Sequence, residues 1–232
     1  MAITEAAPNQ FPFLVDVFVD EGKGKGSGIL ISPEWVLTSA QLLIGCSSFR
    51  LLFGAHESYY WGSEEGDPPP QRSSVSSEQV FLHPGWNGAT SANNLALIRA
   101  ASPPELNAGV QPLAVLSATG HEVGQAVMGV GRATSLASGK VTTTVQVVEG
   151  TVIEASAAKK YFRDDASMAS QVVVDVHRAA VLTPALISRG AGGPALVGLF
   201  NYGAISDEGP VVYSRLVDYA DWIHANSGIL MG

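Results

Sequence analysis

Glycines surround a single alanine in the stretch Ser188–Gly198, which reads SRGAGGPALVG. Glycines spaced this closely let a backbone approach a bound molecule, because they carry no side chain and adopt conformations that other residues avoid. A proline and an apolar segment follow, so the pattern predicts a loop that leads into a strand. The central residue, Ala191, carries a methyl group, which offers no nucleophile, acid or base. The stretch is therefore typical of a reactive loop whose central residue cannot react.

The candidates for metal binding or nucleophilic chemistry outside this stretch are five histidines and one cysteine. No histidine pair has helical metal-ligand spacing and a lone cysteine cannot build a zinc site, so no metal site is predicted. Cys46 has no adjacent basic residue to lower the pKa of its thiol, which favours a buried or idle thiol over a nucleophile. An exposed Cys46 would leave an intermolecular disulfide as the other option. We expect structural or surface roles for the histidines, which are His56, His83, His121, His177 and His224.

Composition and charge exclude several classes of function. The chain has 232 residues, of which 46% are hydrophobic and 15% charged, as in a globular protein. A formal net charge of −8 with only 13 lysines and arginines lacks the excess of basic residues that is typical of nucleic-acid-binding proteins. No apolar run approaches the ~20 residues of a membrane-spanning helix, and the first residues lack the features of a signal peptide. We therefore expect neither nucleic acid nor a membrane as a partner.

Short strand patterns recur along the whole chain at a spacing of roughly ten residues, which is typical of a sandwich or barrel. Two segments read as helices, 155–164 and 216–225, and the second has an apolar face suited to docking on a sheet. Segment 61–74 has the composition of an exposed loop. Its acidic run 63–67 could bind calcium, but the prolines that follow favour a solvated loop. Strands are predicted at 13–19, 28–32, 36–40, 48–54, 76–82, 126–131, 142–153, 171–176, 195–201 and 210–216.

Six segments, taken in order, resemble the trypsin-like serine proteases. GSGILISPEWVLTSAQL (26–42) resembles the segment that carries their histidine, and ANNLALIRA (92–100) the segment that carries their aspartate. RGAGGPALVG (189–198) resembles the nucleophile loop G-D-S-G-G-P. FNYGAIS (200–206) and GPVVYSRLVDYADWI (209–223) resemble the substrate-binding strand and the ending of the family. The opening EAAPNQFPFLV (5–15) resembles the mature N-termini of arthropod members.

The resemblance implies an all-β fold of two Greek-key six-stranded β-barrels packed together, with the active site between them and a C-terminal α-helix. A single trypsin-like domain would then span residues 1–232. The N-terminal barrel is expected at about 10–105, the C-terminal barrel at about 115–215, and the helix at about 216–226. The Pro-punctuated segment 99–115 is the expected link between the barrels.

The same resemblance places Gln41, Asn94 and Ala191 at the positions of the catalytic histidine, aspartate and serine. A serine protease needs a nucleophilic oxygen, an imidazole that takes its proton, and a carboxylate that orients the imidazole. Losing the serine or the histidine alone costs roughly a million-fold in kcat in related chemistry. The expected triad is therefore catalytically inactive.

Two further positions of the nucleophile loop depart from the family pattern. Arg189 replaces the glycine beside the oxyanion hole, and Gly190 replaces the acid that pairs with the freed amino terminus. Without that acid, the amino terminus gains nothing by burial. We expect Met1–Glu5 to lie on the surface and the loop Ser188–Gly192 to be zymogen-like or collapsed.

The substrate cleft implied by the resemblance is altered as well. Ala185 would form the pocket floor, where trypsin-type enzymes have aspartate. Gly203 keeps one glycine of the pocket wall, whereas Val211 replaces the other and would fill the pocket. Asn201 and Tyr202 replace the usual Ser-Trp pair of the substrate-binding strand, whose edge could still pair with a backbone.

The cysteines of the family are also replaced. Gly26 and Leu42 stand where the resemblance implies a disulfide beside the histidine, and Ile187 replaces a cysteine beside the nucleophile. A single cysteine by itself favours a reducing compartment. The family is overwhelmingly extracellular, and we give this implication more weight, so a secreted protein is expected.

The sequence therefore predicts a non-catalytic serine protease homologue that acts through protein binding, without a cofactor. Its expected partner is a protease, a protease inhibitor or another component of a protease pathway, for which it would serve as regulator, cofactor or decoy. A structural, storage or carrier protein on the same scaffold is the alternative. A hydrolase with a relocated site is the third reading.

Overall fold

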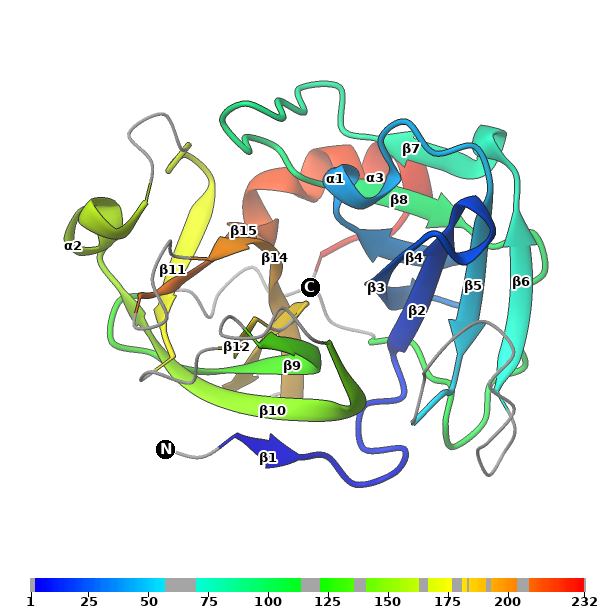
Figure 1. The fold of residues 1–232 in the computed structure, drawn as a ribbon, viewed down its shortest axis with the longest axis horizontal. Coiled ribbons are helices and arrows are strands. Elements are labelled where there is room, and N and C mark those ends of the chain that lie inside the picture. The colour runs from blue at the N-terminus through cyan, green and yellow to red at the C-terminus, as the bar shows by residue number, and fades with distance from the viewer. Residues whose placement is uncertain are drawn as a thin grey trace.

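Strands make up most of the regular structure in the computed structural model of the protein. The structure describes residues 3–56, 70–113, 122–135, 141–162, 167–176, 181–182, 184–190, 193–203 and 209–231. The strands form two antiparallel sheets that curl side by side, and apart from the short strand β1 (Thr4–Glu5) each sheet comes from one half of the chain (Figure 1). The segments that form them are rich in β-branched and aromatic residues, which fit a pleated, half-buried surface.

The N-terminal sheet has seven strands among the described residues, in the order β6-β5-β2-β3-β4-β8-β7. Alternate residues of β2 point into its interior, where Val15, Val17 and Val19 pack with Leu51 and Phe53. The curled sheet therefore encloses an apolar core of its own. Its strands are β2 (Leu14–Val19), β3 (Gly24–Ser32), β4 (Trp35–Thr38), β5 (Phe49–Phe53), β6 (Gln71–Val75), β7 (Val80–Leu82) and β8 (Ala96–Arg99).

The C-terminal sheet closes on itself. Strands β10, β11, β15, β14, β13 and β9 follow one another, and β9 pairs again with β10, so six strands complete a ring. The two short strands β1 and β12 attach to β10 and β9 at its rim. The predicted fold of two trypsin-like β-barrels is thus confirmed. The strands are β1 (Thr4–Glu5), β9 (Ala126–Ser135), β10 (Val141–Ile153), β11 (Gln171–Asp175), β12 (Val181–Leu182), β13 (Ala185–Gly190), β14 (Gly193–Gly203) and β15 (Val211–Arg215).

A further apolar core joins the two barrels. It combines Ile29 and Leu37 of the N-terminal barrel with Val130 and Leu199 of the C-terminal barrel, and Ile223 of the C-terminal helix packs against them. All five side chains are at most 2% exposed. The two barrels therefore share a closely packed apolar core.

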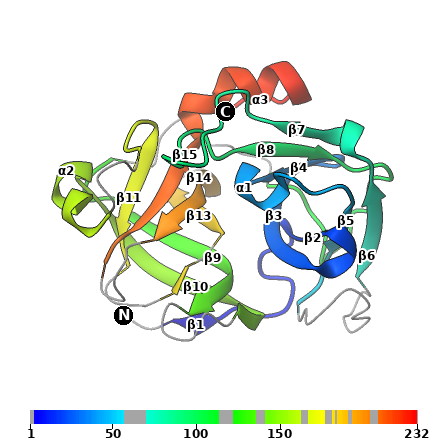
Figure 2. The same ribbon diagram turned by 45° about the horizontal axis from the view of Figure 1, so that its top comes forward.

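Helices are short and few in the described part of the chain. The predicted C-terminal helix is confirmed as α3 (Ala220–Ser227), which follows a 3₁₀ turn at Leu216–Tyr219 and lies across the top of the junction between the barrels (Figure 2). It ends at Gly228, whose φ of 74° suits the left-handed cap at a helix end. The predicted helix 155–164 is shorter than expected, because only Ala155–Ala158 (α2) is α-helical and a 3₁₀ turn follows.

One predicted loop is partly wrong. Residues 71–74 belong to strand β6, which pairs with β5, and their polar character reflects a strand with one face in solvent. The acidic run 63–67 lies outside the described residues. The expected surface location of the N-terminus is confirmed for Ile3, Thr4 and Glu5, which are exposed while β1 pairs along β10.

Candidate functional site

Gln41 and Asn94 lie next to each other at the edge of the N-terminal barrel. Strand β4 leads into the short helix α1 (Ala40–Leu43), which carries Gln41, and Asn94 lies two residues before β8. The backbone N–H of Gln41 donates a hydrogen bond to Oδ1 of Asn94 over 2.9 Å. Asn94 is buried, whereas Gln41 is exposed. The structure thus brings together two of the three residues that the resemblance placed at the positions of the catalytic triad.

A chain of neutral amides continues from this pair into the C-terminal barrel. Nδ2 of Asn94 donates to Oδ1 of Asn201 over 3.0 Å, and Nδ2 of Asn201 donates to the carbonyl oxygen of Ser91 over 2.9 Å. Asn94 and Asn201 are 1% and 2% exposed. We call Gln41, Asn94 and Asn201 the amide chain. Its direction is fixed by the partners at its two ends, because a backbone N–H can only donate and a carbonyl can only accept.

The loop before β8 is held in an unusual conformation around the amide chain. Ser91 and Asn93 have φ values of 56° and 54°, a region that residues with side chains seldom adopt. Oδ1 of Asn93 accepts a hydrogen bond from the Tyr219 hydroxyl, and the carbonyl oxygen of Thr90 accepts one from the N–H of Ser167. Contacts with the C-terminal barrel therefore hold this loop from two sides.

Tyr202 is directed away from the amide chain and ties β14 to a neighbouring loop. Its hydroxyl donates to the carbonyl oxygen of Ser167 over 2.8 Å, and its ring packs edge-on against Phe162 with centroids 5.3 Å apart. Burial raises the pKa of the Tyr202 hydroxyl to about 12. The group therefore stays protonated at physiological pH and serves as a hydrogen-bond donor.

The residues expected to shape a specificity pocket lie in different cores. Ala185 is fully buried in the core between the barrels, where it pairs with Val130 and Leu199. Val211 packs inside the C-terminal barrel and pairs with Gly203 across strands β15 and β14. The structure does not bring Ala185 and Val211 to one pocket.

The glycine-rich stretch forms a hairpin far from the amide chain. Ser188–Gly190 belongs to β13, and Gly193 begins β14 with a φ of 101° and pairs with Gly190. The prediction of a loop is therefore wrong for these residues, because antiparallel pairing continues almost to the turn. Ala191 lies outside the described residues. Asn201 lies eight residues after Gly193 along β14, a path of about 26 Å at the usual rise of a strand.

Arg189 likewise lies at the opposite end of the C-terminal barrel. It is exposed and lines a surface hollow together with Ala126, Met128, Glu149 and Ile187. These residues share one face of strands β13, β9 and β10, since Met128 pairs with both Ile187 and Glu149. The structure does not bring Arg189 or Gly190 to the amide chain.

The histidines and the cysteine within the described residues offer no activated group. Nδ1 of His83 accepts a hydrogen bond from the N–H of Gly85, its ring packs on Tyr219 and Trp222, and burial lowers its pKa. Burial, followed by the nearby Asp20 carboxylate, raises the pKa of the Cys46 thiol. His56 and His224 belong to the described residues, whereas His121 and His177 lie outside them.

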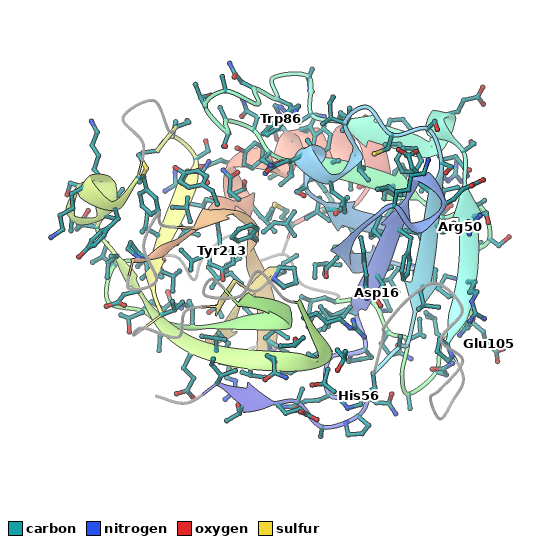
Figure 3. The ribbon with its side chains drawn as sticks, in the orientation of Figure 1. Asp16, Arg50, His56, Trp86, Glu105 and Tyr213 are labelled. Atoms are coloured by element: carbon teal, nitrogen blue, oxygen red, sulfur yellow. The ribbon has the colours of Figure 1, made fainter. Side chains whose placement is uncertain are left out.

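A buried ion pair between the barrels escaped the sequence reasoning. Nη1 of Arg132, on β9, lies 2.8 Å from Oδ1 of Asp16, on β2, and both residues are at most 6% exposed. Arg132 also donates to the carbonyl oxygens of Ala55 and His56. Asp16 lies on the side of the N-terminal barrel that faces its partner barrel (Figure 3). A charge inside the apolar run FLVDVFV was the available signal, since a buried carboxylate needs a partner.

Lys25 completes this ionic cluster from the adjacent strand β3. Its ammonium group lies 3.7 Å from Oδ2 of Asp16 and 5.3 Å from the centre of the Phe18 ring. Burial lowers the pKa of Lys25, whereas the carboxylate of Asp16 acts in the opposite direction. The cluster therefore joins β2, β3 and β9 through charge as well as through packing.

The two positions of the missing disulfide face each other. A Cβ atom placed on Gly26 would lie only 2.5 Å from Cδ2 of Leu42 and 3.1 Å from its Cγ. The side chain of Leu42 thus occupies the space above the glycine. Packing between these two residues replaces the bridge that the resemblance implied.

The described residues form neither a cluster of metal-binding side chains nor a membrane-spanning helix. Within the described residues, no group of three or more histidine, cysteine, aspartate or glutamate side chains is placed to hold a metal ion. No helix among these residues is long and apolar enough to cross a membrane.

A model of the trypsin family matches residues 2–223 of the chain. Since this match covers nearly the whole sequence, the protein belongs to the trypsin family. It is similar to brachyurin of Leptuca pugilator, with 30% identity over 106 residues, which are 46% of this chain and 43% of the relative. Snake venom serine protease KN14 of Trimeresurus stejnegeri is 32% identical over 110 residues, covering 47% of this chain and 39% of the relative.

A third relative is the chymotrypsin-like elastase family member 3A of Homo sapiens, with 30% identity over 112 residues. This alignment covers 46% of this chain and 40% of the relative. The chain therefore aligns with less than half the length of each of these curated relatives.

Proposed function

We propose that the protein is a non-catalytic member of the trypsin family that acts by binding another protein. The amide chain carries the proposal, because Gln41 and Asn94 meet where the family pattern places an imidazole and a carboxylate. Acyl transfer needs a base that accepts a proton and a charge that stabilises the resulting cation. Primary amides supply neither near neutral pH.

The surroundings of the amide chain support the same conclusion. Asn201 supplies a buried amide oxygen that accepts a hydrogen bond from Asn94, so every side-chain nitrogen and oxygen of Asn94 and Asn201 has a partner and the two amides cost little to bury. His83 would be a substitute base, but its Nδ1 accepts a hydrogen bond from Gly85 and its ring packs at a tilt against Trp222 of α3. These contacts favour a site that has been rebuilt for stability over one that awaits activation.

The expected partner is a protease, a protease inhibitor or another member of a protease pathway, and we propose that the protein meets it outside the cell. Membership in the trypsin family supports this proposal, as does the description of one relative as a venom protease. The role would be that of a regulator, cofactor or decoy. The scaffold itself is compatible with many roles, since a fold does not fix a function.

The catalytic part of the proposal is tested with a fluorophosphonate probe and a panel of small esters. An active trypsin-family protease at equal concentration serves as the positive control, and the same enzyme blocked beforehand serves as the negative control. We expect no labelled residue and no ester turnover above the blocked enzyme. Stoichiometric labelling at one residue together with turnover would contradict the proposal.

The binding part is tested by capture from the fluid in which the protein occurs. The immobilised full chain is compared with a blocked active protease of the same family, so that binding common to the scaffold is subtracted. We expect a protease, an inhibitor or a pathway protein to be retained in stoichiometric amounts. High abundance of the chain in one tissue without such a partner would favour the storage or carrier alternative.

A further inference from the structure

The end of the C-terminal barrel that meets the amide chain is built by residues just before β13. The N–H of Phe200 donates to the carbonyl oxygen of Pro184 over 2.9 Å, and Phe200 immediately precedes Asn201. Asn201 in turn contacts Asn94. Strand β13 begins directly after Pro184 and therefore starts beside the amide chain.

The stretch that resembles the nucleophile loop lies at the other end of the same strands. Arg189 pairs with Pro194 and Gly190 with Gly193, at the tip of the β13–β14 hairpin. The length of β14 then separates this tip from Asn201. A nucleophile has to lie within hydrogen-bond reach of its base, so residues at this tip cannot serve the position of Gln41.

The sequence offers two prolines in the same local setting. Pro184 precedes Ala-Leu-Ile and Pro194 precedes Ala-Leu-Val, and each leads into an apolar strand. The residues that follow the two prolines do not distinguish them, whereas the glycines before Pro194 favour the second. The contacts of the folded chain favour the first, because only Pro184 adjoins the amide chain.

We infer that Val181, Leu182 and Pro184 occupy the place from which a nucleophile would face Gln41, and that Val181 stands at the nucleophile position. In the pattern G-D-S-G-G-P the serine precedes the proline by three residues, which is the offset from Val181 to Pro184. Val181 and Leu182 form β12, which pairs with Ser135 and Thr134 of β9.

This inference deepens the proposed function and rests on it, because it takes the site to be inactive. Valine has no group that attacks a carbonyl, so the nucleophile is absent by this assignment too. The connection from the end of β11 at Asp175 to the start of β13 at Ala185 also contains only nine residues. A short connection leaves little chain with which to build a pocket wall beside the amide chain.

The assignment is tested by cross-linking between cysteine pairs in a Cys46→Ser background. One variant carries Gln41→Cys and Val181→Cys, and the matched control carries Gln41→Cys and Ala191→Cys. Both are treated under native conditions with a bismaleimide of about 10 Å span and mapped by mass spectrometry. We expect an intramolecular cross-link in the first variant and at least tenfold less in the second. Efficient linkage of positions 41 and 191, with none between 41 and 181, would overturn the assignment.

A second measurement guards against a variant that fails to fold. Nitroxide labels on the same two pairs report distances by pulsed electron resonance, and circular dichroism verifies the fold of each labelled protein. The distance from position 41 to position 191 should exceed that from position 41 to position 181 by at least 10 Å, given the length of β14. Equal distances would contradict the inference. Neither experiment depends on activity, so labelling by the phosphonate probe would refute the proposed function and leave this assignment standing.

Discussion

The contact between Gly26 and Leu42 makes a disulfide the sharpest test of the packing beside α1. Replacing both residues by cysteine removes the Leu42 atoms that would collide with a Cβ on residue 26. Cγ of Leu42 is one bond from its Cβ, so the two Cβ atoms lie within about 4.6 Å, close to the range of 3.5–4.5 Å seen in disulfides. The φ angle of Gly26 lies outside the left-handed region, so the backbone tolerates a side chain there.

The expected gain follows from two opposing contributions. The bridge would close a loop of about 17 residues, which by the chain-entropy estimate stabilises the fold by about 3 kcal/mol. Loss of the half-buried Leu42 side chain costs about 1–2 kcal/mol of apolar burial. The net gain in the free energy of unfolding is therefore about 1–2 kcal/mol. For a chain of this size, it raises Tm by roughly 2–8 °C.

The assay compares thermal unfolding of oxidised Gly26→Cys/Leu42→Cys with that of the chain that keeps Gly26 and Leu42, because both redox forms of the double variant lack the Leu42 side chain. A Cys46→Ser background is needed, because Sγ of Cys46 lies 3.7 Å from the carbonyl oxygen of Leu42 and would compete for pairing. The single variant Gly26→Ala should lower Tm, since its methyl group meets Leu42. Failure of the double variant to oxidise, or a lower Tm after oxidation, would show that the two positions do not face each other in solution.

Three further results are expected. Arg132→Met should cost about 3–5 kcal/mol in the free energy of unfolding because it leaves Asp16 buried without its guanidinium partner. Adding Asp16→Leu should recover only part of the loss, because the carbonyl oxygens of Ala55 and His56 still lack their donor and Lys25 loses its carboxylate. Urea unfolding measures both variants, and a loss below 1 kcal/mol in the single variant would contradict the buried pair. Burial lowers the folded pKa of His83, so its neutral ring stabilises the fold fully above the ordinary pKa near 6.5, and this contribution is lost as pH falls through the lowered value. His83→Gln should flatten Tm between pH 5 and 7, and an unchanged slope would exclude the histidine as its source. Asn94→Asp should lower the free energy of unfolding by about 1–3 kcal/mol because a carboxylate cannot donate to Asn201. Adding Asn201→Ser, whose hydroxyl can donate to the carboxylate, should restore part of that stability. An Asn94→Asp variant as stable as the parent would refute the direction of the amide chain.

The sequence predicted the barrels and the C-terminal helix because local patterns encode them. Runs such as Leu14–Val19 show the strand signal in their own residues, and α3 shows its apolar face. The sequence also predicted that Gln41 and Asn94 belong to one site, because their segments resemble those of a known family and follow in the same order. The structure brings the two residues into contact.

The rest depended on contacts that no local pattern contains. Asp16 and Arg132 are 116 residues apart, so neither reveals the other in the sequence. The glycines of 188–198 are compatible with a loop and with a hairpin turn, and pairing with β9 and β14 decides between them. The short helix α1 has too few residues for a recognisable period.

Strand β1 precedes the N-terminal barrel in the sequence but pairs with the C-terminal barrel. Thr4 pairs with Val147, and the N–H of Ala6 donates to the carbonyl oxygen of Val145, so these residues find their partners only after β10 has been synthesised. At about 5–20 residues per second, a ribosome needs roughly 7–30 s to add the intervening 143 residues. During this interval the N-terminal barrel can assemble from β2 onwards while the residues ahead of it stay unpaired. A nascent chain arrested before β10 should therefore leave Thr4–Ala6 open to cleavage by an endoprotease, whereas pairing with β10 protects these residues in the folded protein.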